Sequence, residues 1–221
     1  MICLYCHSNI QEEPDIITLF KKPSPLCLVC RELLTEWRTG LRCDFCHRLM
    51  EEDWHKCMDC DFLKRRFTPP AKITCLLEYN QTVKMLFHRY KFMGDYALSE
   101  VLAELLDIDL QGYDAVIPIP LSENRFGERG YNQTAAVLEQ KRIVYKEALA
   151  TTDRARQSEL SKVLRVNGEN PFSVLNGSEF RDRRLLLVDD VYTTGMTVHH
   201  ALEKLYTISP SSVDVLTFSK A

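Results

Sequence analysis

Eight cysteines in the first 60 residues form four pairs, each with two residues between its members. The pairs are Cys3 and Cys6, Cys27 and Cys30, Cys43 and Cys46, and Cys57 and Cys60. Two thiolates at this spacing hold one side of a tetrahedral ion, and four thiolates favour zinc, which is borderline soft and has no d-electron preference for geometry. The spacing therefore predicts two structural Zn²⁺ sites with these eight ligands.

Sequential pairing is the simplest arrangement, because 20 residues separate the first two pairs and 10 separate the second two. A crossed arrangement, pair one with three and two with four, is the alternative. Disulfides, an iron–sulfur cluster or redox catalysis also use such pairs, but are less expected in a cytoplasmic chain with four matched pairs. We interpret His7, His47 and His55 as surface or supporting residues, and Cys75 as a core residue.

A second chemical segment, residues 183–197, reads RRLLLVDDVYTTGMT. Its apolar run predicts a buried strand, followed by Asp189 and Asp190, a loop of hydroxyl residues with Gly195, and the start of a helix. Amides at a helix start have no intrahelical partner, so the loop predicts an anion site. The paired carboxylates suit two neighbouring sugar hydroxyls. The plainer alternative is that the acids end a strand and Thr194 caps a helix.

Composition indicates an ordinary globular protein of 221 residues, 45% hydrophobic and 27% charged. No stretch approaches the ~20 apolar residues of a membrane span, and the first residues lack a signal-peptide pattern, so we expect a cytoplasmic protein. The net charge of -3, with 11 basic and 11 acidic residues in 1–72, gives no general attraction to nucleic acid. A DNA contact would need a local cluster such as Lys64, Arg65 and Arg66.

The cysteine distribution and the Pro69-Pro70 pair predict a boundary near residue 70. We expect a double zinc-ribbon domain over 1–70 and a second domain over 71–221. A unit of about 70 residues is marginal by its core alone, whereas structural zinc contributes on the order of 10–16 kcal/mol. Metal should therefore decide whether the first unit folds.

Apolar runs alternate with helical patterns after residue 72, which predicts an α/β fold with a mainly parallel, Rossmann-like sheet. In such sheets ligands bind at the carboxyl ends of the strands. The expected strands are Ile73 to Tyr79, Ala115 to Ile119, Ile143 to Ala148, Leu185 to Val188 and Val213 to Phe218. The expected helices cover about 81–91, 97–107, 131–141 and 197–206.

The segment from Arg183 closely resembles the phosphoribosyl pyrophosphate motif of type I phosphoribosyltransferases. The resemblance implies that Asp189 and Asp190 hold the ribose. It also implies that the 5-phosphate is held by the loop residues Thr193, Thr194, Gly195, Met196 and Thr197. A second match is formed by Val116 to Leu121, followed by Arg125 and residues 129–133. It looks like the strand and the pyrophosphate-side loop of these transferases. Arg125 and Arg129 would bind pyrophosphate oxygens there, or would be ordinary surface arginines near a turn.

With these motifs, the chain resembles the ComF family of competence proteins over nearly its whole length. The likeness also rests on the cysteine pairs and on Lys91-Phe92-Met93-Gly94, residues 154–158, and Arg165 with Asn167. Membership implies a zinc ribbon and a phosphoribosyltransferase domain, and a role in natural transformation, handling single-stranded DNA that enters the cytoplasm. Residues 154–170 are our candidate for a closing loop, in which Arg154 and Arg156 stabilise leaving pyrophosphate; a solvated loop is the alternative.

Three functions stay open on the sequence. An active phosphoribosyltransferase would displace pyrophosphate from the anomeric carbon of phosphoribosyl pyrophosphate carried with Mg²⁺, using a nucleobase or amine acceptor. A noncatalytic binder would grip the sugar phosphate while basic and aromatic residues contact single-stranded DNA. An adaptor would dock other DNA-uptake proteins through its zinc ribbon. The candidate DNA contacts are Lys84, Arg89 and Lys91 with Phe87 and Tyr90, although helical spacing makes the aromatic pair typical of core.

Overall fold

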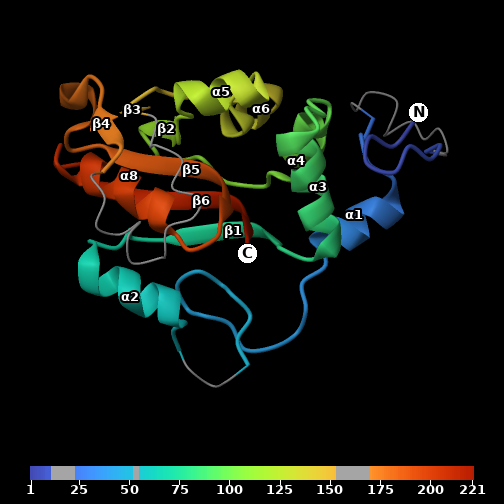
Figure 1. The fold of residues 1–221 in the computed structure, drawn as a ribbon, viewed down its shortest axis with the longest axis horizontal. Helices are drawn as coiled ribbons and strands as arrows, with labels where there is room; N and C mark the ends of the chain where they lie inside the picture. Colours follow the sequence, from blue (N-terminus) through green and yellow to red (C-terminus); the bar gives the residue numbers. More distant parts are fainter. Residues whose placement is uncertain (11–22, 52–54, 153–169) are drawn as a thin grey trace.

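Four parallel strands form the central sheet of the computed structural model, which describes residues 1–10, 23–51, 55–152 and 170–221 (Figure 1). The strand order is β1, β6, β5, β2, and each neighbouring pair is parallel. Strands β3 and β4 form a separate antiparallel pair. The predicted α/β class with a mainly parallel sheet is confirmed. The strands are β1 Ile73–Glu78, β2 Ala115–Pro118, β3 Leu149–Thr151, β4 Phe172–Val174, β5 Arg184–Tyr192 and β6 Ser212–Lys220.

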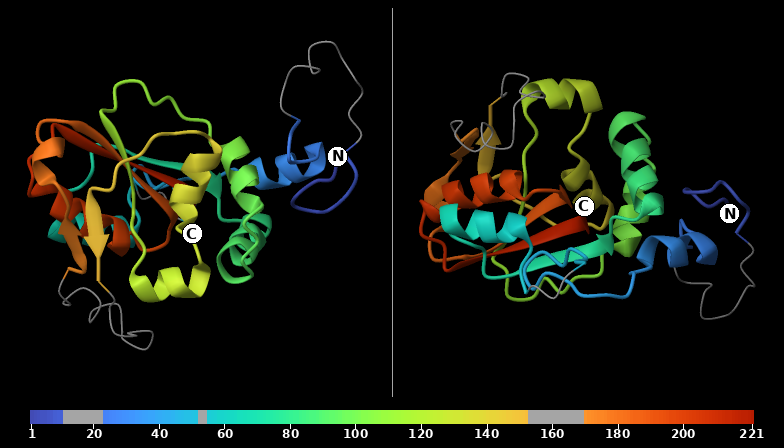
Figure 2. Two further views of the ribbon diagram at one scale, coloured as in Figure 1. Left: turned by 90° about the horizontal axis from the view of Figure 1, so that it is seen from above. Right: turned by 60° about the horizontal axis from the view of Figure 1, so that its bottom comes forward.

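Helices cover both faces of this sheet (Figure 2). Leu186 and Val188 of β5 share a buried cluster with α1, α3, α4 and α6, whereas Leu185 and Leu187 share another with α8 and the second cysteine group. A strand buried on both faces reads as a continuous apolar run, as β5 does at its start. The helices are α1 Leu28–Thr35, α2 Met58–Arg66, α3 Gln81–Phe92, α4 Leu98–Leu105, α5 Glu123–Arg129, α6 Gln133–Gln140 and α8 Met196–Tyr206, with a 3₁₀ turn, η1, at Gly177–Phe180.

Helix α3 matters most for the site, and its sequence explains both its start and its orientation. The Asn80 side chain accepts a hydrogen bond of 2.8 Å from the Val83 amide and so caps the first turn. Buried positions at 83, 86, 87 and 90 follow the helical repeat and face the core. Phe87 and Tyr90 are 2% and 1% exposed, which confirms the core interpretation and removes both rings from the candidate DNA contacts.

The strand predicted over Ile143 to Ala148 is wrong. The Lys146 amide donates to the Val116 carbonyl of edge strand β2 at 2.8 Å, but Val144 is 85% exposed. Ile143 and Ala148 pack against the core, but Val144 faces solvent and the segment forms no regular ladder with β2. Regular pairing begins only at β3. None of the helices in the described ranges combines the length and hydropathy needed to span a bilayer.

Candidate functional site

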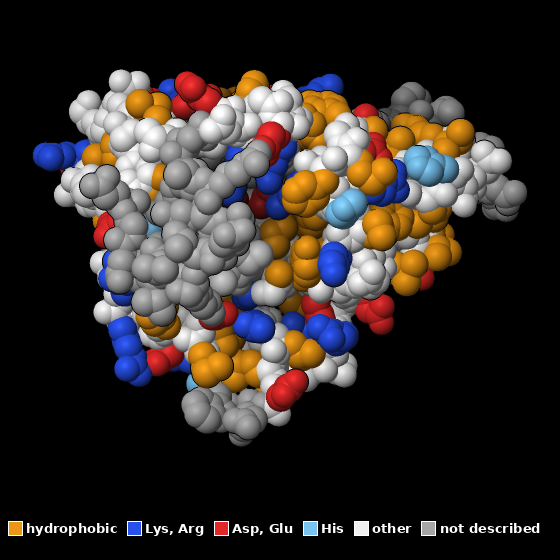
Figure 3. Space-filling view, in the orientation of Figure 1, with side chains coloured by type: hydrophobic (Ala, Val, Ile, Leu, Met, Phe, Trp, Pro, Cys, Tyr) orange, Lys and Arg blue, Asp and Glu red, His pale blue; other side chains and the backbone are white. Residues whose placement is uncertain are grey.

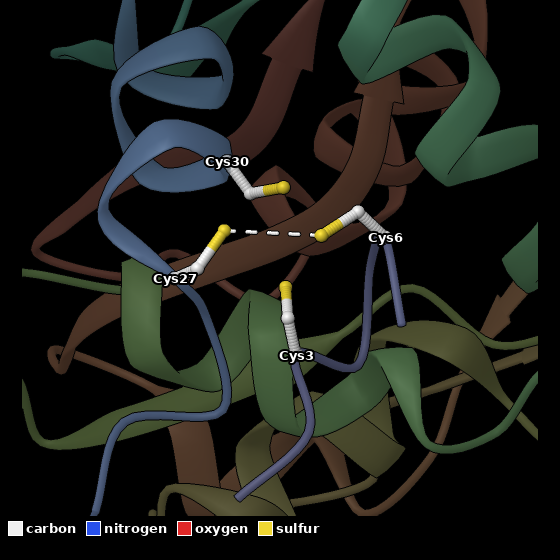
Figure 4. A group of neighbouring side chains, drawn as sticks. All are labelled: Cys3, Cys6, Cys27 and Cys30. Carbon is white, nitrogen blue, oxygen red and sulfur yellow. Dashed lines mark hydrogen bonds between the residues drawn. The ribbon is translucent and has the colours of Figure 1, made fainter. Parts of the chain in front are cut away.

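The paired cysteines come together as two groups of four among the described residues. The grouping is sequential: Cys3, Cys6, Cys27 and Cys30 form the first group, and Cys43, Cys46, Cys57 and Cys60 form the second. In the first group, the four sulfur atoms point toward a common centre (Figure 4). Helices α1 and α2 begin directly after Cys27 and Cys57, so each helix start fixes one cysteine pair.

The sulfur positions fit a tetrahedral metal ion. Sγ of Cys6 lies 3.8 Å from Sγ of Cys27, and Sγ of Cys46 lies 3.7 Å from Sγ of Cys57. Zinc–sulfur bonds of ~2.3 Å in a tetrahedron place sulfur atoms about 3.8 Å apart, whereas a disulfide joins them at ~2.05 Å. The geometry therefore matches a Zn²⁺ site of four thiolates.

The nearby histidines stay outside both four-cysteine groups. His7 is exposed, Nε2 of His47 lies 3.3 Å from the Ile73 carbonyl oxygen, and His55 lies 3.6 Å from Asp44. Cys75 is buried against the second group, with its thiol accepting a hydrogen bond from the Thr217 hydroxyl at 3.2 Å. Its predicted place in the core is confirmed.

The two cysteine groups pack against different parts of the molecule, the first near α3 and the second against the sheet. Near the first group, the Tyr5 hydroxyl donates to the Thr82 carbonyl at 3.2 Å, and Arg89 donates to the Tyr5 carbonyl at 2.5 Å, so this segment is fastened to α3. The second group shares a buried cluster with Ile73 and Tyr192 on the sheet. In Figure 1, α1 accordingly lies beside α3, and α2 lies below the sheet.

Asp189 and Asp190 belong to β5, which continues to Tyr192, rather than to a loop that follows the strand. This corrects the predicted strand end at Val188. Strand β2 pairs with β5 only as far as Val188, whereas β6 continues alongside to Tyr192. Beyond Val188, β5 has thus lost one neighbour, and the two acids lie at the carboxyl edge of β2, where a parallel sheet opens.

The two carboxylates have different surroundings. Burial, and to a smaller extent the negative charge of Asp190, raises the pKa of Asp189 to about 7. Asp190 instead forms an ion pair of 2.6 Å with Nζ of Lys91, from the last turn of α3. The carboxyl group of Asp189 is therefore partly protonated near pH 7, whereas the carboxylate of Asp190 is paired with a cation.

The loop after β5 is shaped by Gly195 and Tyr192. Gly195 has a φ of +80° and precedes the first residue of α8, so the N–H groups of that helix turn face the loop. A Cβ atom at position 195 would lie 2.3 Å from the Tyr192 hydroxyl oxygen, so only glycine fits here. Lys220, 5% exposed, donates from Nζ to the Thr193 carbonyl at 2.8 Å and fixes the other end of the loop.

Arg125 and Arg129 lie on a helix, α5, where a loop was expected. Four residues apart, they project from one side of this helix. Arg129 donates to Oε1 of Gln133 at 2.8 Å, and burial lowers its pKa while Asp190 opposes that effect. Helix α5 ends at Gly130, whose φ of +78° turns the chain toward α6.

One cleft of about 1390 Å³ brings these elements together. Figure 3 shows basic and acidic side chains inside the hollow beside α3. Gly195 is not among the described residues that line the cleft. Arg154 and Arg156 lie outside the described residues. The predicted ligand-binding residues that line the cleft are Asp189, Asp190, Thr193, Thr194, Met196, Thr197, Arg125 and Arg129.

The described residues that line the cleft include four basic and four acidic side chains. Lys84, Lys91, Arg125 and Arg129 face four carboxylates, those of Asp189, Asp190, Glu123 and Glu128. The ion pair of Lys91 and the role of Lys220 were not foreseen from the sequence. Lys91 was singled out for its motif and its place on α3, but nothing in the sequence shows which acid it meets.

Curated proteins match the chain along its length, although no family model does. The chain is 31% identical to the competence protein ComFC of Streptococcus pneumoniae, with 99% of each chain covered. It is 29% identical to ComFC of Bacillus subtilis, covering 98% of this chain and 95% of that one. It is also 26% identical to the DNA utilization protein YhgH of Escherichia coli K12, covering 86% and 94%.

A solved structure of glutamine phosphoribosylpyrophosphate amidotransferase from B. subtilis, complexed with ADP and GMP, is similar at 19% identity and a TM-score of 0.36. It covers 56% of this chain and 26% of that chain, and a score this low says nothing about function. The sequence relationship is much more extensive, since it spans both cysteine groups and the cleft. On that relationship, the chain belongs to the ComF family of competence proteins.

Proposed function

We propose that the cleft binds phosphoribosyl pyrophosphate together with Mg²⁺. The observation that carries this proposal is the convergence of three features on one cleft: the acids Asp189 and Asp190, the loop before α8, and the two arginines of α5. Each feature suits a different part of the ligand. A diol, a terminal phosphate and a pyrophosphate would meet carboxylates, amides and guanidinium groups, respectively.

The acids accept hydrogen bonds from the ribose 2- and 3-hydroxyls, while residues 193–197 donate to the 5-phosphate. Hydrogen bonds to a charged group contribute ~1.5–3 kcal/mol each, more than the ~0.3–1 kcal/mol of a helix dipole. Arg125 and Arg129 hold the pyrophosphate. Lys91 is already paired with Asp190, and Glu123 and Glu128 also line the cleft. A polyanion therefore needs added positive charge, which Mg²⁺ bound to the ligand's own oxygens supplies.

We further propose that the protein acts in the cytoplasm during natural transformation and helps handle single-stranded DNA. Relatives named competence proteins and DNA utilization proteins support this role. Residues 1–70 form a double zinc ribbon in this proposal, and residues 71–221 form a phosphoribosyltransferase-type domain. The zinc ions are structural, because four thiolates leave no ligand position open at either site.

Catalysis is the second candidate function. In this proposal, Arg125 and Arg129, which line the cleft, would stabilise the charge that the leaving pyrophosphate gains as the ribosyl group is transferred to a nucleobase or amine. The proposed Arg154 and Arg156 would act on the same group. An adaptor role for the zinc ribbon predicts instead that the full chain with its cleft acids replaced still retains DNA-uptake proteins.

One titration separates these functions. Purified protein is titrated with phosphoribosyl pyrophosphate with and without Mg²⁺, and pyrophosphate release is then measured with mixed nucleobases, amines and single-stranded DNA. Binding that requires Mg²⁺ supports the proposed site, and pyrophosphate release adds catalysis. Absence of binding at millimolar ligand would refute the proposal.

A further inference from the structure

Helix α3 presents a second chemical pattern to the cleft besides its buried side. Lys84, His88 and Phe92 are spaced four residues apart, all three are exposed, and all three line the cleft. We name them the α3 stripe. Residues four apart lie above one another on a helix, so the stripe is a continuous row running into the site. Its length from Lys84 to Phe92 is about 12 Å, the length of roughly three or four stacked nucleotides at ~3.4 Å each.

The ring of Phe92 is accessible. Phe92 is 71% exposed, whereas Phe87 and Tyr90 of the same helix are buried. The His88 ring lies 5.6 Å from the Phe92 ring at a tilt of 44°, and Cζ of Arg129 lies 6.0 Å from its centre. An exposed phenyl ring with an imidazole and a guanidinium group nearby offers a stacking face with positive charge beside it.

The charge of the helix also favours an anionic strand. Helix α3 has no acidic residue, whereas it has Lys84, Arg89 and Lys91 as well as His88. Arg89 is paired with Asp95 at 2.6 Å, and Lys91 with Asp190. Arg89 and Lys91, two of the predicted DNA contacts, are thus engaged in ion pairs. Lys84 is exposed on the stripe and is the cation positioned to contact a phosphate of a bound strand.

We propose that the α3 stripe binds single-stranded nucleic acid, with a base stacked on Phe92 and the backbone near Lys84. The proposal deepens the DNA-handling part of the proposed function and rests on it for the class of ligand. Sequence-tolerant binding is expected, since every base has a face for stacking. Phe92 and Lys84 are not among the residues proposed to hold the sugar phosphate, so the two ligands use different side chains of the cleft.

Fluorescence anisotropy with a labelled 15-nucleotide oligo-dT and the full-length protein tests this proposal. Phe92→Ala should weaken binding about 5- to 150-fold, the range for loss of one base–aromatic stack, whereas Phe92→Trp should retain it. Lys84→Gln should reduce the slope of log K against log salt by about 0.7. The matched control is Met85→Ala, because Met85 is an exposed apolar residue of α3 outside the cleft lining, and it should bind like the wild type.

Three outcomes would overturn the proposal: no oligo-dT binding by the wild type, equal binding by Phe92→Ala and Met85→Ala, or equal affinity for single strand and duplex. Melting curves check that the variants fold, which the exposure of Phe92 leads us to expect. Replacing Asp189 and Asp190 by asparagine should abolish sugar phosphate binding and leave oligo-dT binding in place. Failure of the stripe and failure of the sugar phosphate site are therefore distinguishable.

Discussion

The amino group of Lys91 lies 2.6 Å from a carboxylate oxygen of Asp190, so an ion pair joins helix α3 to strand β5 across the cleft. Both side chains are largely shielded, with 14% and 16% exposed. This pair links helix α3, to which the first cysteine segment is hydrogen-bonded, with β5, the strand that carries the site. It also occupies one of the two proposed ribose acceptors until a ligand arrives.

Lys91→Met should lower the free energy of unfolding by about 1–3 kcal/mol, because it leaves a shielded carboxylate without its cation while keeping the alkyl chain. Urea denaturation followed by circular dichroism measures the change. The control is Lys84→Met, an exposed lysine of the same helix, for which a change within about 0.5 kcal/mol is expected. Equal effects of the two substitutions would contradict a role for the ion pair.

Asp189 should make stability depend on pH. Its pKa of about 7 in the folded protein exceeds the ~3.9 of an unfolded aspartate, so the folded state binds more protons between these values. This residue's contribution to the free energy of unfolding therefore falls as pH rises from about 4 to 7. His199, whose pKa burial lowers to about 4, acts in the opposite direction between about 4 and 6.5.

Comparison with Asp189→Asn isolates the first effect, since His199 is common to both proteins. Urea denaturation at pH 4.5 and pH 7.5 should show the variant gaining stability relative to the wild type at the higher pH. A difference that stays the same at both pH values would mean that Asp189 is ionised throughout this range.

Gly195→Ala should disrupt the loop before α8. The new Cβ atom would lie 2.3 Å from the Tyr192 hydroxyl oxygen in a backbone with positive φ, so we expect a loss of roughly 3 kcal/mol or more. Gly130→Ala is the matched control, because Gly130 also has positive φ but has no atom within 4 Å of the added Cβ among the described residues. It should cost only about 1 kcal/mol.

Thermal and urea denaturation of both glycine variants measure this difference. Calorimetry should also find weaker binding of phosphoribosyl pyrophosphate to Gly195→Ala than to the wild type. Equal losses of stability in the two variants would show that the contact with Tyr192 is unimportant and that backbone conformation alone matters.

Metal content tests the two cysteine groups. Elemental analysis of the wild type should find two zinc ions per chain, and Cys3→Ser and Cys43→Ser should each retain about one. Because the second group is packed with Ile73 and Tyr192 against the sheet, Cys43→Ser should weaken phosphoribosyl pyrophosphate binding more than Cys3→Ser does. Iron in place of zinc, or sulfur oxidation with no bound metal, would contradict the predicted sites.

Much of the fold was predictable because the apolar residues of α3, β5 and α8 are spaced as their buried positions are. The apolar start of β5 and the spacing of buried residues in α3 and α8 gave elements close to those observed. The Cys-x-x-Cys pairs similarly led to the correct sequential grouping. In each case the residues that define the element are neighbours along the chain.

Other features depend on contacts between distant segments. The apolar residues at 143–148 predicted a strand, but Val144 is exposed at the sheet edge and the segment is not a strand. Residues 189–192 extend β5 because β6 continues beside them, and the two aspartates that begin this extension give no local sign of it. The pairing of Lys91 with Asp190 joins positions 99 residues apart, so only the tertiary structure reveals it.

Isothermal titration calorimetry with phosphoribosyl pyrophosphate and Mg²⁺, comparing the wild type with the double variant Asp189→Asn and Asp190→Asn, tests the central claim most directly. Circular dichroism and melting curves of both proteins accompany it. We predict saturable heat for the wild type and none for the folded double variant. Equal affinity in the two proteins would contradict the assignment of these acids to the ribose.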